Sequence, residues 1–215
     1  MIKIDILSDP ICPWCLIGKT FLDKALEIRP DHVFTLEWHP YMLNPKMPKN
    51  GMDREEYLIN KFGSKHNATE AYQKIIETIS KNDIEVNFNN IKRTPNTLDA
   101  HRLIHWAGLE GKQEKAINSL FHEYFVMGKD ISNDHVLSSI ASDISMNHKS
   151  FNHAIKTNKD VKSISDRIKN ASTKGVTGVP CFIVNNQYVL QGAQPTKLWL
   201  KVIDETVNLN NTKLY

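Results

Sequence analysis

Hydrophobic and polar residues alternate at the start of the chain and again about thirty residues later. Residues 2–7 read IKIDIL and residues 33–40 read VFTLEWHP, with an apolar side chain at every second position. A period of two residues is typical of a strand that buries one face. Between them, residues 16–30 carry apolar side chains at helical spacing and end at Pro30, which stops a helix. The first forty residues therefore predict a βαβ unit.

The middle of the chain changes to a helical period. Apolar residues recur at helical spacing in six stretches, at residues 68–81, 96–112, 116–125, 133–144, 150–158 and 160–172. A segment rich in proline and glycine, residues 44–56, precedes them and is predicted to be a loop.

The last forty residues return to the strand pattern. Residues 179–184 and 188–192 read as two strands, and Asn185 and Asn186 between them tolerate the positive φ of a tight hairpin turn. Residues 195–207 predict a closing helix. The sequence thus predicts an α/β fold.

This order of elements predicts two domains. A small α/β sheet domain is built from two segments, residues 1–45 and 174–215. An inserted helical domain, residues 46–173, lies between them in the chain.

Composition limits the function classes. The 215 residues include 24 acidic side chains and carry a formal charge of only +3, which argues against nucleic acid as a partner. No apolar run is long enough to cross a bilayer, so no membrane partner is expected. The first ten residues are too polar for a signal peptide, so we expect a cytoplasmic location. The composition gives no indication of the oligomeric state.

Three cysteines are far too few for a disulfide scaffold. Two of them, Cys12 and Cys15, lie in the stretch DPICPWCLIG, directly after the first predicted strand. If Cys12 caps the following helix, Pro13 occupies the first helical position, where its missing N–H costs nothing. The unpaired N–H groups and the helix dipole then stabilise a Cys12 thiolate. Cys15 lies within disulfide reach. The motif therefore predicts a redox pair in which Cys12 attacks and Cys15 resolves.

A zinc clip is the alternative explanation of the cysteine pair, with the protein acting as a binding or chaperone-like module. Zinc sites usually need a second pair of ligands, and the chain has no second cysteine pair. His101 and His105 are four residues apart on a predicted helix, but such histidines more often cap or pack. A C-x-x-C beside a βαβ pattern favours redox chemistry, and we expect no metal.

Several stretches together resemble the DsbA-like thioredoxin-fold oxidoreductases, and most closely their FrnE-type branch. That branch is related to 2-hydroxychromene-2-carboxylate isomerases and kappa-class glutathione transferases. The stretches are DPICPWCLIGK, EWHPYMLNP, NTLDAHRLIHWA, EYFVMGKDIS and GVTGVPCFIVNNQYVLQGAQP. The resemblance implies a thioredoxin fold with an inserted helical domain. It also implies disulfide exchange with protein or small-molecule thiols and disulfides, with no cofactor besides the redox-active pair. Glutathione is a possible co-substrate.

The resemblance also implies where substrate binds. The Val179–Pro180 bond is expected to be cis and to lie opposite Cys12, with the Val179 backbone free to bind an extended substrate. Without the resemblance, an ordinary trans proline at a strand start would be expected. Further substrate-binding candidates lie between the cysteines and in two other family stretches, namely Pro13, Trp14, Asn44, Asn96 and His101. Helix capping for Asn96 and an outer-face position for His101 are equally good explanations.

Three points stay open in the sequence. Many thioredoxin-like proteins carry a buried acid six residues before the first cysteine, and that position is Ile6 here. A water molecule or Asp9 is left to take the Cys15 proton. Cys181 is either a third redox thiol or, as burial statistics favour, a core residue. A glutathione-dependent isomerase or transferase on the same fold is the alternative function, although such relatives usually have serine at the Cys12 position.

Overall fold

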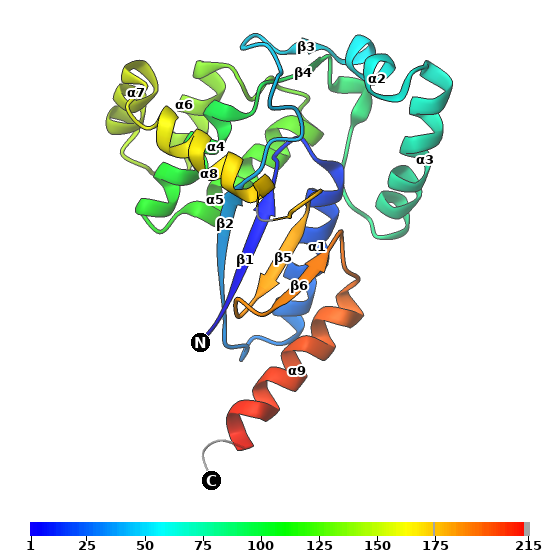
Figure 1. The fold of residues 1–215 in the computed structure, drawn as a ribbon, viewed down its shortest axis with the longest axis vertical. Coiled ribbons are helices and arrows are strands. Elements are labelled where there is room, and N and C mark those ends of the chain that lie inside the picture. Colours follow the sequence, from blue (N-terminus) through cyan, green and yellow to red (C-terminus); the bar gives the residue numbers. More distant parts are fainter. Residues whose placement is uncertain (174, 213–215) are drawn as a thin grey trace.

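The computed structural model describes residues 1–173 and 175–212 of the chain. Its centre is a four-stranded sheet in the order β2-β1-β5-β6 (Figure 1). The strands are β1 (Ile2–Ser8), β2 (Phe34–Pro40), β5 (Cys181–Val184) and β6 (Tyr188–Gln191). β1 runs parallel to β2 and antiparallel to β5, and β5 runs antiparallel to β6. Chain segments more than 170 residues apart in sequence therefore form one sheet.

The turn between β5 and β6 has the predicted chemistry. Asn185 and Asn186 both adopt positive φ, at 53° and 55°. A type I′ hairpin turn requires two successive residues in the left-handed region, and asparagine adopts that conformation with little strain.

One face of the sheet is covered by α1 (Pro13–Ile28) and α9 (Thr196–Thr212). Ile4 and Ile6 on β1 are fully buried on this face. Phe182 on β5 stands opposite Ile6 and packs edge-on against a tryptophan of α9, with ring centroids 4.9 Å apart. The alternation of the strand sequence thus selects the side chains that meet these two helices.

The opposite face is covered in part by α8 (Val161–Thr173). Leu7 on β1 stands opposite Cys181 on β5, and both pack against Ala171 of α8. α8 also packs along β2. The predicted boundary between residues 173 and 174 therefore falls directly after a helix that contacts the sheet, and the division into two domains stays a prediction.

The remaining helices, here called the helical block, lie around the upper part of the sheet (Figure 1). They are α2 (Arg54–Phe62), α3 (Lys65–Lys81), α4 (Leu98–Leu109), α5 (Gln113–Phe121), α6 (Asp134–Asp143) and α7 (His148–Thr157). In Figure 1, α4–α7 lie on one side and α2 and α3 on the other. A short ladder joins β3 (Met52–Asp53) to β4 (Arg93–Thr94), and α5 continues into a π-helical turn, His122–Val126.

The loop prediction for residues 44–56 is wrong at its end. β3 and the first turn of α2 lie within this segment, and the Asp53 side chain caps α2 by accepting a hydrogen bond from the Glu56 amide. α2 is only nine residues long and begins within the proline- and glycine-rich segment, so its short apolar pattern did not stand out from the loop.

Candidate active site

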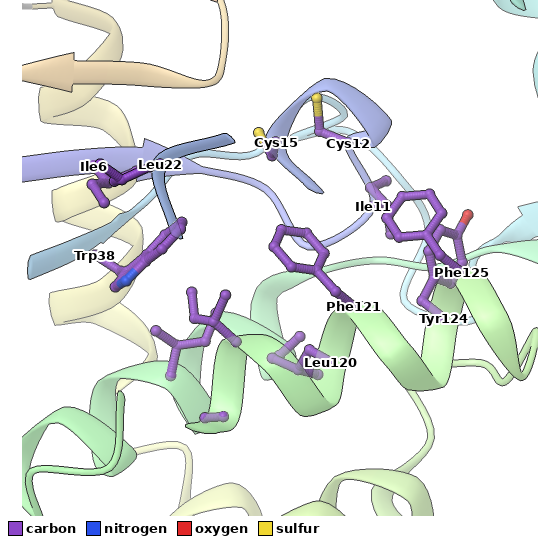
Figure 2. Packing of buried hydrophobic residues seen from close by; sticks show 14 of the residues in the cluster. Ile6, Ile11, Cys12, Cys15, Leu22, Trp38, Leu120, Phe121, Tyr124 and Phe125 are labelled. Carbon is purple, nitrogen blue, oxygen red and sulfur yellow. The ribbon is translucent and has the colours of Figure 1, made fainter. Parts of the chain in front are cut away.

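The Cys-Pro-Trp-Cys turn begins α1 at the carboxyl end of β1. Cys12 is the N-cap residue, with extended backbone angles, and Pro13 follows at the first helical position. The Cys12 amide donates to the Asp9 carbonyl at 2.9 Å, and the Cys12 carbonyl accepts from the Cys15 amide at 3.0 Å. Figure 2 shows both sulfur atoms at this turn, with Ile11 beside them. The backbone therefore places the first thiol where the helix has unpaired N–H groups.

Cys12 faces the segment that leads into β5. Its Sγ donates to the Val179 carbonyl at 3.6 Å, and the Val179–Pro180 peptide bond is cis. Gly18, on the second turn of α1, lets Pro180 approach the helix, because a Cβ at that position would lie 3.0 Å from the Pro180 Cγ. The first two turns of α1 and the cis-proline segment are thus packed directly against each other.

Cys15 lies on the buried side of the same turn. Both cysteines are free thiols, and Cys12 is 4% exposed while Cys15 is 1% exposed. Burial, together with the neighbouring Cys12, raises the pKa of the Cys15 thiol well above its usual range. The neighbouring Ser8 hydroxyl and Asp9 amide act in the opposite direction and lower that pKa, because each can donate to a Cys15 thiolate. Cys15 is therefore a protonated thiol, and it must lose its proton before it can act as a nucleophile.

The Asp9 side chain holds the loop before Cys12 in place. Its carboxylate is fully buried and accepts hydrogen bonds from the Leu43 amide at 2.8 Å and the Ile11 amide at 3.3 Å. Thr97 at the start of α4 also donates to it. Burial raises the pKa of Asp9 to about 6. These bonds fix the loop before Cys12 to the loop after β2 and to the helical block.

The two predicted asparagines lie in the loop region that borders this turn. Asn44 accepts a hydrogen bond from the Tyr57 hydroxyl at 3.2 Å, and its buried Nδ2 has no partner among the described residues. Asn96 donates to the Met47 carbonyl at 2.7 Å and accepts from the Leu98 amide at 3.0 Å. The N-cap residue of α4 is Thr97, so the capping explanation for Asn96 is wrong by one position, although Asn96 still accepts from the first helical amide.

His101 is buried, and the outer-face explanation for it is wrong. It is 3% exposed, and its Nε2 lies 3.0 Å from the Tyr41 carbonyl. Burial lowers the pKa of His101 to about 4. The imidazole is therefore neutral near pH 7 and donates its Nε2 hydrogen to this carbonyl. His101 holds the loop after β2 against α4.

Trp14 and Cys181 take different positions relative to the redox pair. Trp14 is partly buried and packs against the main core, which also includes Cys12 and Cys15. Cys181 is fully buried with Leu7 on the α8 side of the sheet, whereas α1 covers the other side. The sheet thus separates Cys181 from the motif thiols.

The described residues contain one group of three side chains close enough to share a metal ion, and it excludes the cysteines. The group is Asp5, Glu37 and His39. The Lys3 ammonium already lies 2.8 Å from Asp5 and 2.5 Å from Glu37. The carboxylates of this cluster, on the α8 side of the sheet, are therefore already paired with Lys3.

Ser8 is the site residue that sequence reasoning missed. It is 3% exposed and lies beside Cys15. The alternation of β1 contains the signal, because positions 4, 6 and 8 share the face that α1 covers. A serine at the last of these positions puts a hydroxyl beneath the active-site turn.

Comparisons with known proteins identify the family of the chain. The family model described as DSBA-like thioredoxin domain matches residues 3–204. Uncharacterized protein YwbO of Bacillus subtilis (strain 168) is 25% identical over 205 residues, which cover 95% of this chain and 96% of that protein.

Two solved structures extend the comparison. The probable DsbA oxidoreductase SCO1869 from Streptomyces coelicolor matches with a TM-score of 0.85 at 21% identity, covering 97% of this chain and 91% of its own. Cytosolic disulfide reductase DsbM from Pseudomonas aeruginosa, solved with GSH, matches with a TM-score of 0.64 at 15% identity, covering 99% and 98%. At these identities the two structures show a shared fold. No helix in the described part of the chain is long and apolar enough to cross a membrane.

Proposed function

The chain belongs to the DSBA-like thioredoxin family, and from this premise we propose that it is a thiol-disulfide oxidoreductase acting through Cys12 and Cys15. One observation carries the proposal. Cys12 is a free thiol at the N-cap of α1 and faces the Val179 carbonyl, with the buried Cys15 thiol in the same turn. This arrangement supplies a thiol at a helix N-terminus, a second thiol within reach and a neighbouring backbone edge.

Cys12 is the nucleophile of the proposed reaction. As a thiolate it attacks one sulfur of a substrate disulfide, so that a Cys12–substrate disulfide forms and the substrate S–S bond breaks. The departing sulfur keeps the electron pair and takes a proton from solvent. The N–H groups at the start of α1 and the helix dipole stabilise the attacking anion.

Cys15 completes the exchange. Its thiolate attacks the Cys12 sulfur, the Cys12–Cys15 disulfide forms, and the second half of the substrate leaves as a thiolate. The substrate disulfide has then been reduced and the protein dithiol oxidised. The reverse sequence oxidises a substrate dithiol, so the same site serves either direction.

The cis-proline segment forms the proposed substrate platform. Pro180 has no N–H to compete for the Cys12 sulfur, and Val179 offers its backbone to an extended substrate. Pro13 and Trp14 border the same turn, and Asn44 lies in the loop after β2, which the Leu43 amide ties to Asp9. These features suit a peptide or a small thiol such as glutathione. We further propose a cytoplasmic location, because DsbM, which shares the fold, is a cytosolic disulfide reductase.

Glutathione disulfide provides the test of this function. The reduced protein should form an intramolecular Cys12–Cys15 disulfide, detected by mass spectrometry, and reduced glutathione should reverse it. Cys12→Ser should abolish turnover, and Cys15→Ser should leave glutathione trapped on Cys12. Cys181→Ala is the matched control and should behave as wild type.

The same preparation tests the alternative functions. Isomerisation of 2-hydroxychromene-2-carboxylate should be absent or slight. Turnover of that substrate in a variant that lacks both motif cysteines would refute the redox assignment, because the cleft rather than the thiols would then do the chemistry. Stoichiometric zinc in the purified protein, lost on substitution of the cysteines, would refute it as well.

A further inference from the structure

Ser8 is the last residue of β1 and faces the helix that carries the redox pair. Ile4 and Ile6 on the same side of the strand are fully buried beneath α1, and Ser8 is 3% exposed. Cys15, on the buried side of the first turn of α1, is 1% exposed. Strand alternation therefore places a hydroxyl and a thiol together in a space that water barely reaches.

The Ser8 hydroxyl lacks a hydrogen-bond partner among the described residues. A buried hydroxyl without a partner costs stability, so its presence calls for an explanation. A neutral thiol is a weak acceptor, which accounts for the missing bond in the reduced protein. A thiolate is a strong acceptor, so the hydroxyl gains a partner when Cys15 ionises.

Among the described residues, no carboxylate takes this part. The place of the buried acid of many thioredoxin-like proteins is taken by Ile6, which has no polar group. The Asp9 carboxylate is already engaged by the amides of Ile11 and Leu43. What Asp9 offers to Cys15 is its backbone N–H. The two groups that face the Cys15 sulfur, the Ser8 hydroxyl and the Asp9 amide, are therefore both hydrogen-bond donors.

We propose that Ser8 is a positioning residue whose hydroxyl, together with the Asp9 amide, donates hydrogen bonds to the Cys15 thiolate during the resolving step. The inference rests on the proposed function and assigns a residue to it. The Cys15 thiol loses its proton, its thiolate attacks the Cys12 sulfur, and the substrate sulfur departs with the electron pair and takes up a proton in turn. Ser8 keeps its own proton throughout. Burial raises the pKa of Cys15, and the hydroxyl opposes that effect.

The size of the effect follows from the charge on the acceptor. Losing one hydrogen bond to an anion corresponds to an upward pKa shift of about one pH unit or more. A more basic thiolate is also a better nucleophile, with a Brønsted slope near 0.5. At pH 7 Ser8→Ala should have about tenfold less Cys15 thiolate, but each thiolate should react about threefold faster. The rate of the resolving step should therefore fall about threefold. At a pH above the Cys15 pKa of both the parent and Ser8→Ala, the resolving step of Ser8→Ala should be as fast as that of the parent or faster.

Stopped-flow reaction with Ellman's reagent separates the two thiols. Attack by Cys12 releases the first thionitrobenzoate, and attack by Cys15 on the mixed disulfide releases the second. The parent is Cys181→Ala, which removes the third thiol. In Ser8→Ala the first phase should be unchanged, and the pH midpoint of the second phase should rise by about one unit. Thr94→Val removes another buried hydroxyl without a described partner and should leave both phases unchanged.

Stability gives a second readout. Ser8→Ala removes a buried hydroxyl that makes no hydrogen bond of normal geometry, so the reduced variant should be as stable as the parent in urea or more stable. An unchanged pH midpoint of the second phase in Ser8→Ala would overturn the inference and leave the proposed function standing. A parent protein without a second phase would overturn both.

Discussion

Two buried titratable side chains beside the active-site turn should oppose each other in the pH dependence of stability. Burial lowers the pKa of His101 from 6.5 to about 4, and burial raises the pKa of Asp9 from 3.8 to about 6. Between pH 4 and pH 6 the unfolded chain binds a proton at His101 that the folded chain does not bind. In the same interval the folded chain keeps a proton on Asp9 that the unfolded chain has lost.

The signs follow from proton linkage. The contribution of His101 is fully present above pH 6.5 and is lost as the pH falls towards 4. The contribution of Asp9 is fully present below pH 3.8 and is lost as the pH rises through 6. One pKa unit corresponds to about 1.4 kcal/mol, so each residue changes the free energy of unfolding by about 3 kcal/mol. The two contributions nearly cancel in the wild-type protein.

Urea denaturation of two near-isosteric variants between pH 4 and pH 7 separates the contributions. His101→Gln keeps a donor for the Tyr41 carbonyl, and Asp9→Asn keeps an acceptor for the Leu43 amide. The stability of wild type relative to His101→Gln should rise by about 3 kcal/mol from pH 4 to 6.5, and relative to Asp9→Asn it should fall by about 3 kcal/mol from pH 4 to 6. Stability curves parallel to wild type for both variants would refute this reasoning.

Three further substitutions probe the scaffold around the site. Cys181→Ala should cost about 1 kcal/mol through loss of a buried sulfur and leave both phases of the Ellman reaction intact, and a large loss of rate in a folded variant would contradict its core position. Arg102→Met should cost about 3–5 kcal/mol in urea denaturation, because it leaves Asp160, now 2.6 Å from the guanidinium, without its buried partner. Gly18→Ala places a Cβ 3.0 Å from Pro180 and should lower both stability, by about 1–3 kcal/mol, and the rate of exchange with glutathione disulfide. Wild-type rates in Gly18→Ala would show that this contact does not position the platform.

The elements of the fold could be predicted wherever a short local pattern of residues determines the secondary structure. The α/β class, confirmed by the structure and by the family match, followed from residue alternation in β1 and β2 and from the helical spacing between them. Pro13 indicated the start of α1, and Asn185 and Asn186 indicated the hairpin. These signals are local and need no knowledge of the rest of the chain.

The features that sequence reasoning missed depend on contacts between distant segments. α4 buries residues around much of its circumference, including His101 and Arg102, so its periodicity does not reveal an outer face. The partners of those side chains, Tyr41 and Asp160, are about 60 residues away in sequence. α2 was missed for a different reason, because it is only nine residues long and begins within the predicted loop segment. Ser8 was visible in the strand alternation, but its significance depends on Cys15 lying above it.

The helical block packs against the Cys12–Cys15 turn as well as against the sheet. One hydrophobic cluster contains Cys12 and Cys15 together with Phe121 and Phe125 from α5 and the turn that follows it. Figure 2 shows Phe125 beside Ile11, the residue that precedes Cys12. Because a close-packed interior has few voids, the position of the active-site turn is set from both sides. A substrate that bonds to Cys12 therefore meets a turn whose geometry is fixed by the sheet, by α1 and by the helical block.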